Sequence, residues 1–375
     1  MADPKSKSPN RDSRPPKGEG STRRRVERER ARTQEDELDI PEPKLEWMDR
    51  TLQWGVKVKP GKGGLTLGSI NVGVYGEIPD HWEDQTRMPR GAYPMPGVAP
   101  IGYSLRNKHE LWADNAADLY EEAIQRRWIP ATDIPWATIA PLPDDVETAV
   151  CQLSTELSQQ ANVEFEVIGH WLQHMSYGYH EVKAFLATEM FDAARHSEAF
   201  RKRALANGGG LGLESRGEVN RMILESKGGW SETVLFLHLL RGTFTLTLYR
   251  HGEAFAHNAA EKVLFGRCVQ DKARHIAYGL AHLRYAITHQ QDKALVFKRL
   301  LSIGETVLAR ELTDPVLVEV LAVIFGGGVE GARAGMRRAE RVFGDFARQY
   351  LAYTDWLGIG RGEQFPKELA RYMEA

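Results

Sequence analysis

The sequence predicts an all-α protein whose central part is a four-helix bundle with a polar interior. In residues 146–175, 181–203, 231–256 and 260–288, apolar residues recur at steps of three and four, the spacing of one helical face. Each apolar stripe is interrupted near its middle by a charged or imidazole side chain. Burying such groups is costly unless they pair or hold a metal ion, so the four segments indicate a bundle with a central site.

A short repeat lies within two of these segments. The hexads FDAARH, residues 191–196, and QDKARH, residues 270–275, share an Asp-x-x-Arg-His frame. On a helix, this spacing places the aspartate and the histidine on the same face, so both hexads can present polar groups to the same interior.

Composition predicts an ordinary cytoplasmic globular protein. Hydrophobic residues make up 42% and charged residues 27% of the 375 residues, which is enough to bury a substantial core. No apolar run approaches the roughly 18 residues of a membrane helix, and the N-terminus has no secretory segment. Cys151 and Cys268 are the only cysteines, which excludes a disulfide framework and a cysteine-rich zinc site.

The chain divides into four expected regions. Residues 1–40 are expected to form a disordered basic tail, because residues 1–33 contain eleven Lys/Arg against five Asp/Glu and almost no apolar side chains. The rest of the chain is acidic and resembles no nucleic-acid-binding fold, so a nucleic-acid partner is not expected. Residues 41–105, rich in Gly and Pro, predict an extended, loop-rich arm. Residues 106–290 hold the bundle, and 291–375 are expected to add helices that pack on it.

The bundle region resembles the ferritin-like superfamily of di-iron carboxylate proteins, related to the ribonucleotide reductase small subunit and to bacterial multicomponent monooxygenase hydroxylases. The matching motifs are QRRWIPATDIPW, NVEFEVI, TEMFDAARHSEAF, NGGGLG, LLRGTFTLTLYR and QDKARHIAYG. This resemblance implies a ferritin-like bundle and a site made of four glutamates and two histidines.

Carried over position by position, the resemblance implies that this chain keeps only half of that ligand set. Glu164, His196 and His275 match ligands. The positions of the other three glutamates are occupied by different residues, namely Ala193, Arg241 and Lys272.

The hexads supply further matches to the family. Asp192 and Asp271 match the acids that buttress the histidine of the opposite half. Arg195 and Arg274 match the arginines of the same motifs.

These substitutions oppose a two-metal centre. Three carboxylates that would balance the metal charge are absent, and two cations stand in their places. The expectation is therefore that no cofactor is bound, with a single Fe or Mn ion at Glu164, His196 and His275 as the fallback. A second set on one helical face is Glu189, Asp192 and His196. The purely structural alternative is that the histidines and ion pairs are satisfied groups of the core.

The expected function follows from this altered centre. It is a metal-depleted, non-catalytic or accessory subunit in a homo- or hetero-oligomer, for example with a catalytic paralogue. The alternative is a non-heme oxidoreductase of the oxidase or monooxygenase type, which would use a mononuclear metal or metal-free radical chemistry. Iron storage is disfavoured, because the sequence lacks a ferroxidase ligand set.

Overall fold

The computed structural model describes residues 20–35, 41–50, 57–82, 90–92 and 97–374. By its internal contacts the chain divides into residues Met1–Gly55 and Val56–Ala375, and each unit is described by itself.

The first unit contains helix α1, Gly20–Glu35, and a 3₁₀ helix, Leu45–Arg50. Helix α1 differs from the expectation that residues 1–40 have no structure; the remaining residues of that range lie outside the described ones. Residues 21–35 contain neither Gly nor Pro and are rich in Arg and Glu, which have high helix propensity. An exposed ion pair one helical turn apart, Arg25–Glu29 at 3.5 Å, supports the helix weakly.

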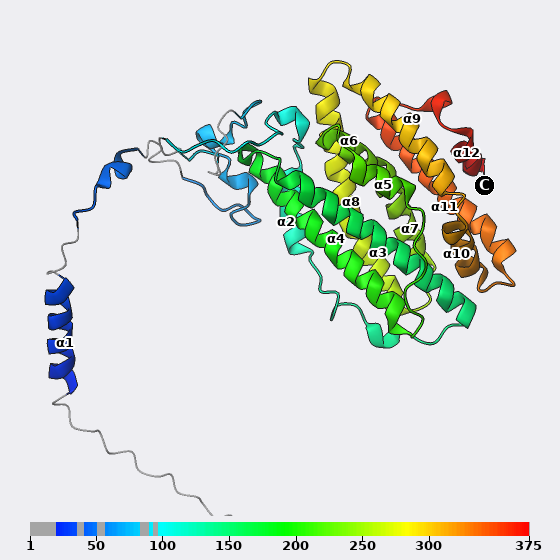
Figure 1. The fold of residues 1–375 in the computed structure, drawn as a ribbon, viewed down its shortest axis with the longest axis horizontal. Helices are drawn as coiled ribbons and strands as arrows, with labels where there is room; N and C mark the ends of the chain where they lie inside the picture. Colours follow the sequence, from blue (N-terminus) through cyan, green and yellow to red (C-terminus); the bar gives the residue numbers. More distant parts are fainter. Residues whose placement is uncertain (1–19, 36–40, 51–56, 83–89, 93–96, 375) are drawn as a thin grey trace, which may run out of the picture. The chain divides into compact units, whose positions relative to one another are not determined.

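The second unit is built around the predicted four-helix bundle, shown in Figure 1. Its long helices are α3, Asp144–Leu172, α4, His180–Ala206, and α8, Ala259–His289. The remaining bundle position is a continuous helical run made of α6, Trp230–Val234, η7, Leu235–Gly242, and α7, Thr243–Ala254. Each of these elements lies within a few residues of its predicted bounds, so the all-α bundle is confirmed.

The segment η7 is a π-helix rather than an α-helix. Its i→i+5 hydrogen bonds wind the backbone more loosely than the α-helical i→i+4 pattern, so side chains three residues apart no longer share a face as they would in an α-helix. All eight residues of η7 are buried. The change of period in a buried helix alters which residues reach the bundle interior.

Local signals define the ends of the long helices. Helix α8 begins at Asn258, whose side-chain oxygen accepts a hydrogen bond from the backbone N–H of Glu261 at 2.9 Å. Helix α3 follows Pro143 and has three acidic residues in its first turn, where they stabilise the positive end of the helix dipole.

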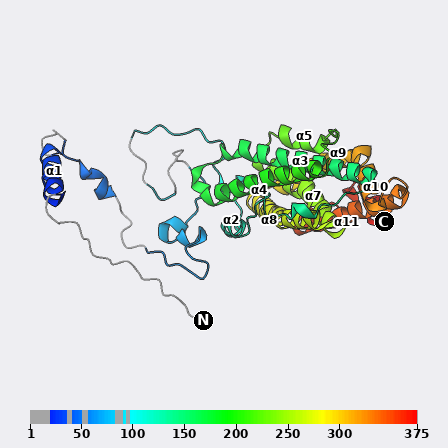
Figure 2. The same cartoon turned by 90° about the horizontal axis from the view of Figure 1, so that it is seen from below.

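Further helices cover one side of the bundle. They are α5, Glu218–Glu225, α9, Lys293–Glu311, α10, Pro315–Gly326, α11, Ala332–Trp356, and α12, Lys367–Ala370. Figure 2 shows α9, α10 and α11 grouped at the C-terminal side of the bundle. The C-terminal segment is held to α9 by Arg361, which forms a buried, two-pronged ion pair with Glu305 at 2.7 and 2.9 Å. The predicted C-terminal helices are thus confirmed.

The arm is irregular in its described residues, 57–82, 90–92 and 97–105, which contain short 3₁₀ turns and isolated bridges. It leads into α2, Ala116–Gln125. One anchor is Arg90, whose guanidinium bonds the Asn71 side chain at 3.0 Å and pairs with the buried carboxylate of Glu181 at the start of α4. None of the helices in the described ranges is long and apolar enough to span a membrane.

Candidate metal centre

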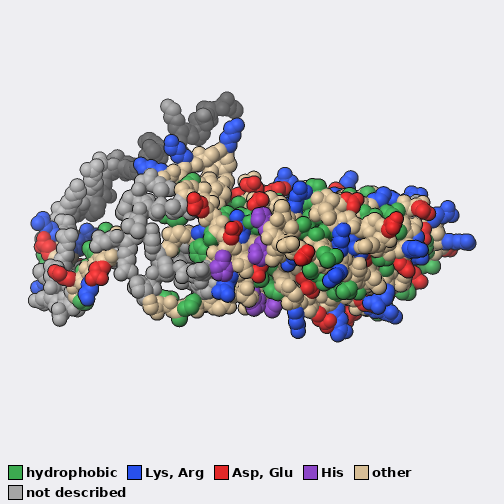
Figure 3. Space-filling model, turned by 90° about the horizontal axis from the view of Figure 1, so that it is seen from above, with side chains coloured by type: hydrophobic (Ala, Val, Ile, Leu, Met, Phe, Trp, Pro, Cys, Tyr) green, Lys and Arg blue, Asp and Glu red, His purple; other side chains and the backbone are tan. Residues whose placement is uncertain are grey.

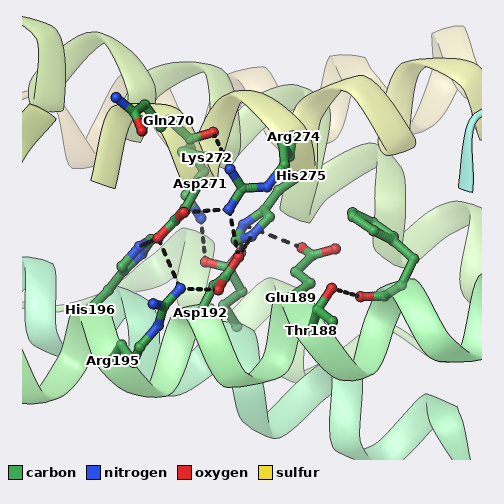
Figure 4. Close-up of polar contacts among 12 residues, drawn as sticks. Thr188, Glu189, Asp192, Arg195, His196, Gln270, Asp271, Lys272, Arg274 and His275 are labelled. Carbon is green, nitrogen blue, oxygen red and sulfur yellow. Dashed lines mark hydrogen bonds and ion pairs between the residues drawn. The ribbon is translucent and has the colours of Figure 1, made fainter. Parts of the chain in front are cut away.

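The two hexads face each other across the bundle interior and form one buried ionic network (Figure 4). Arg195 pairs with Asp192 of its own helix and reaches Asp271 on α8 at 3.4 Å. Arg274 pairs with Asp271 of its own helix and reaches Asp192 on α4 at 3.1 Å. Each arginine therefore bridges both aspartates. The two hexads, which repeat in the sequence, therefore make equivalent contacts with each other in the structure.

Each aspartate also holds the histidine of the opposite hexad. Asp271 lies 3.0 Å from His196 Nε2, and Asp192 lies 3.3 Å from His275 Nε2. Asp271 accepts a further bond, 2.8 Å long, from the indole N–H of Trp128. Burial alone would raise the pKa of Asp271, but His196 and the two arginines around it hold this pKa well below its usual value.

The two histidines, with ring centroids 6.2 Å apart, have pKa values shifted in opposite directions. Burial lowers the pKa of His196, and the bond to Asp271 only partly offsets this effect. Burial also acts against the charged form of His275, but the acids around it raise its pKa to about 9. These acids are Glu189, Asp192 and Glu164. The two environments therefore favour the charged form of His275 and the neutral form of His196.

Glu164 of α3 joins the two members of the second hexad that face it. One carboxylate oxygen accepts a hydrogen bond from Lys272 Nζ, and the other lies 2.8 Å from His275 Nδ1. The pKa of Glu164 lies well below its usual value because, against the effect of burial, Lys272 and His275 both favour its charged form. The ammonium thus supplies positive charge inside the centre.

A second carboxylate reaches the same place from α4. Glu189 is fully buried, and its Oε1 lies 3.7 Å from His275 Nδ1 and 2.6 Å from His238 Nε2 on η7. Within the described residues, Glu189 Oε2 and His238 Nδ1 are buried without a hydrogen-bond partner. Unsatisfied polar atoms of this kind are rare inside proteins and need a specific explanation.

His238 can approach the centre because Gly279 of α8 has no side chain. A Cβ at Gly279 would overlap the Cβ of His238 and lie 3.0 Å from its Nδ1. The close approach of α8 and η7 therefore depends on this glycine, which lies one helical turn after His275.

Glu164, Glu189 and His275 together form a group that fits one metal ion. One ligand atom from each residue lies within 4.8 Å of the others, and all three residues are buried. Two carboxylates and one imidazole are a donor set suited to Mn or Fe. The residues do not fit two ions, because Lys272 already occupies one oxygen of Glu164 and Ala193 has no ligand atom.

The structure places His196 outside this group. The expected mononuclear set contained His196, but its Nε2 is directed at Asp271, and Glu189 contributes the third ligand atom instead. The set Glu189, Asp192 and His196 is not assembled either, because Asp192 is engaged by the arginines.

Arg241 also lies outside the centre, contrary to the expectation. It forms an ion pair with Glu311 of α9, with nitrogen–oxygen distances of 2.7 and 2.8 Å. An α-helical reading of residues 231–256 puts Arg241 on the inner face. The looser winding of η7 moves His238 inward and turns Arg241 towards α9.

Sequence reasoning missed His238 for that reason, whereas Glu189 was visible on the inner stripe of its helix. A signal for His238 was present in Gly279, because a glycine inside a long helix often marks a close approach by another element.

Comparisons with known proteins concern the fold alone. No protein-family profile matches the chain, and no curated protein does. The solved structures that align with it include two variants of an R2-like ligand-binding oxidase with an aerobically reconstituted Mn/Fe cofactor. Each is 16% identical over 68% of this chain, covers 91% or 92% of its own chain, and has a TM-score of 0.45 or 0.44. The all-α bundle expected from the periodicity is seen in the structure itself.

The expectation of no cofactor is contradicted by these structures, which hold a Mn/Fe cofactor. That expectation rested on the loss of three carboxylates, at Ala193, Arg241 and Lys272, and on the cations at the last two positions. Only Lys272 lies in the centre, because Arg241 is turned towards α9.

Proposed function

We propose that this chain is a non-heme oxidoreductase that binds one Mn or Fe ion through Glu164, Glu189 and His275. The observation that carries the proposal is the unpartnered, buried Oε2 of Glu189, which belongs to a compact group of two carboxylates and an imidazole. A bound ion of this kind would supply one-electron redox chemistry at the centre of the bundle.

The surrounding side chains hold each ligand in place. His238 donates to Glu189, Asp192 accepts from His275, and Lys272 donates to Glu164. Such outer contacts fix the orientation of metal-binding side chains and tune their basicity. Binding requires that His275 lose the proton on Nδ1, so the proton must leave as the ion arrives.

Lys272 restricts the centre to one ion. Its ammonium already pairs with the Glu164 oxygen that a second cation would need, and two cations about 4 Å apart repel by several kcal/mol even at an effective dielectric near 20. Lys272 therefore supplies the charge that a second metal ion would otherwise bring.

A second candidate function is a non-catalytic accessory subunit that forms an oligomer with a catalytic paralogue. The observation that favours it is the absence of a carboxylate at Ala193 together with the ion pair of Lys272, since both reduce the ligands left for redox turnover.

Metal analysis of the full-length protein tests the main proposal. Protein produced with Mn and Fe supplied is expected to hold about one equivalent of metal, and Glu189→Gln or His275→Ala should lose it. Glu198→Gln, at an exposed position of α4, serves as the matched control. His196→Gln, which retains a donor for Asp271, should keep the ion. Two equivalents in the wild type, or an unchanged content in Glu189→Gln, would contradict the proposal.

Oxygen uptake separates the two candidate functions. Protein loaded anaerobically with Fe(II) and then exposed to O₂ should consume oxygen and change its absorption if the centre is redox-active. The same metal content without oxygen uptake would favour the accessory role.

A further inference from the structure

An exposed edge of α3 carries three potential metal ligands at steps of four residues. Glu166, His170 and His174 follow one another along this edge, which is distinct from the inner face that carries Glu164. His174 lies just past the end of α3, but its backbone N–H still bonds the carbonyl of Trp171 at 2.9 Å, so the helical course continues through it. Residues four apart on a helix are neighbours on its surface.

The two imidazoles are close enough to bind one ion. Their ring centroids are 5.0 Å apart. Two histidines on one tetrahedral ion, with metal–nitrogen bonds of about 2.0–2.1 Å, need a ring separation of roughly 5 Å. Two histidines at i and i+4 on one helical face are a known arrangement for zinc ligation.

Both rings are free to act as ligands. Among the described residues, no ring nitrogen of His170 or His174 forms a hydrogen bond or ion pair. Glu166 and His170 are exposed, and His174 is half-buried. Histidine side chains are visible at the surface of the bundle in Figure 3. The rings pack against Trp171, but within the described part of the chain their nitrogens have no hydrogen-bond partner and keep their capacity to ligate.

We propose that His170 and His174 form a second metal site, on the surface of α3, which takes a divalent transition-metal ion such as Zn²⁺ through the two imidazoles. Glu166, one helical turn before His170, adds a negative charge beside the site. The imidazoles provide selectivity for a borderline ion over Ca²⁺ or Mg²⁺, which prefer oxygen ligands. Water completes the coordination, because the site is open. This site shares no ligand with the buried centre and stands whether or not that centre binds metal.

Titration of the full-length protein with Zn²⁺ tests the site. The experiment uses Glu189→Gln as the background, so that the buried centre does not contribute. The expected result is one equivalent of bound Zn²⁺, with binding weakened at least about tenfold by His170→Ala or by His174→Ala. Glu166→Gln should weaken it less. His81→Ala changes another exposed histidine and should leave the binding unchanged.

Trp171 provides a local readout. Its ring centroid lies 5.4 Å from that of His170 and 5.9 Å from that of His174. A paramagnetic Ni²⁺ ion at the site should quench its fluorescence, and the quenching should disappear in His170→Ala and in Trp171→Phe. Full Zn²⁺ binding by the double variant His170→Ala/His174→Ala, or quenching that persists in it, would overturn the proposal. Circular dichroism verifies that these surface variants are folded.

Discussion

Lys272 of α8 and Glu164 of α3 form an ion pair inside the bundle, with both side chains about 95% buried. The pair joins two helices that are far apart in the sequence, and the second oxygen of Glu164 is bound to His275. Three charged groups therefore meet at the place where the ligands of a metal converge. Under the proposed function, we expect the charge of Lys272 to limit this centre to one metal ion.

Replacing Lys272 by Met should strengthen metal binding and weaken the metal-free protein. The ammonium no longer repels the ion, so the affinity for Mn(II) should rise at least about tenfold. Unfolding free energy without metal should fall by about 3 kcal/mol or less, because His275 still compensates Glu164. Isothermal titration and urea unfolding measure the two effects. Lys202→Met, which breaks an exposed pair, is the control and should change neither by much. Unchanged Mn(II) affinity would show that Lys272 does not oppose the ion.

Gly279→Ala should displace His238 from Glu189. The new methyl group would overlap the Cβ of His238, and overpacking of this kind costs typically about 1–3 kcal/mol. The midpoint temperature of thermal unfolding and the metal affinity should both decrease. Gly169→Ala is the matched control on α3, because its Cβ would meet only Met190 Sδ at an ordinary 3.5 Å. Equal behaviour of the two variants would argue against the close packing of η7 on α8.

Arg241 and His238 should separate stability from metal binding. Arg241→Met leaves Glu311 buried without its partner and should cost about 3–5 kcal/mol of unfolding free energy, with metal stoichiometry unchanged. His238→Ala removes the contact that orients Glu189 and should weaken metal binding by about 10–100-fold. Loss of metal in Arg241→Met, with retention in His238→Ala, would mean that Arg241 rather than His238 belongs to the centre, as expected from the sequence.

A buried ion-pair cluster between α3, α4 and α8 should make the free energy of unfolding depend on pH in the acid range. Arg203 bridges Glu147 at 2.7 Å and Glu261 at 2.6 Å. Although burial acts against its charge, the contacts with His257 and Arg203 lower the pKa of Glu261 to about 2. An unfolded glutamate titrates near about 4.3, so the contribution of Glu261, up to about 3 kcal/mol, is present above that pH and is lost as the pH falls towards 2.

Urea unfolding from about pH 7 to pH 3 measures this contribution as the difference between wild type and Glu261→Gln. The wild type should lose stability more steeply, and the two curves should approach each other in acid. Parallel curves would mean that the Glu261–Arg203 pair does not contribute.

The sequence by itself determined the helical architecture, because the period of apolar residues reports directly on which helix face is buried. It also identified the hexads and the polar interior, since charged groups such as Glu164 and Lys272 on an inner stripe must find partners. Glu189 lay on the same stripe, but nothing in its position along the chain showed that it would converge with Glu164 and His275.

Only the tertiary structure decided the composition of the centre. Residues 235–242 are wound as a π-helix in which His238 contacts Glu189 and Arg241 pairs with Glu311, an arrangement that the α-helical period of the sequence does not predict. Likewise, His196 can be assigned to Asp271 only when the two hexads are seen face to face. Periodicity specifies a face, whereas the partner on that face depends on the helix that packs against it.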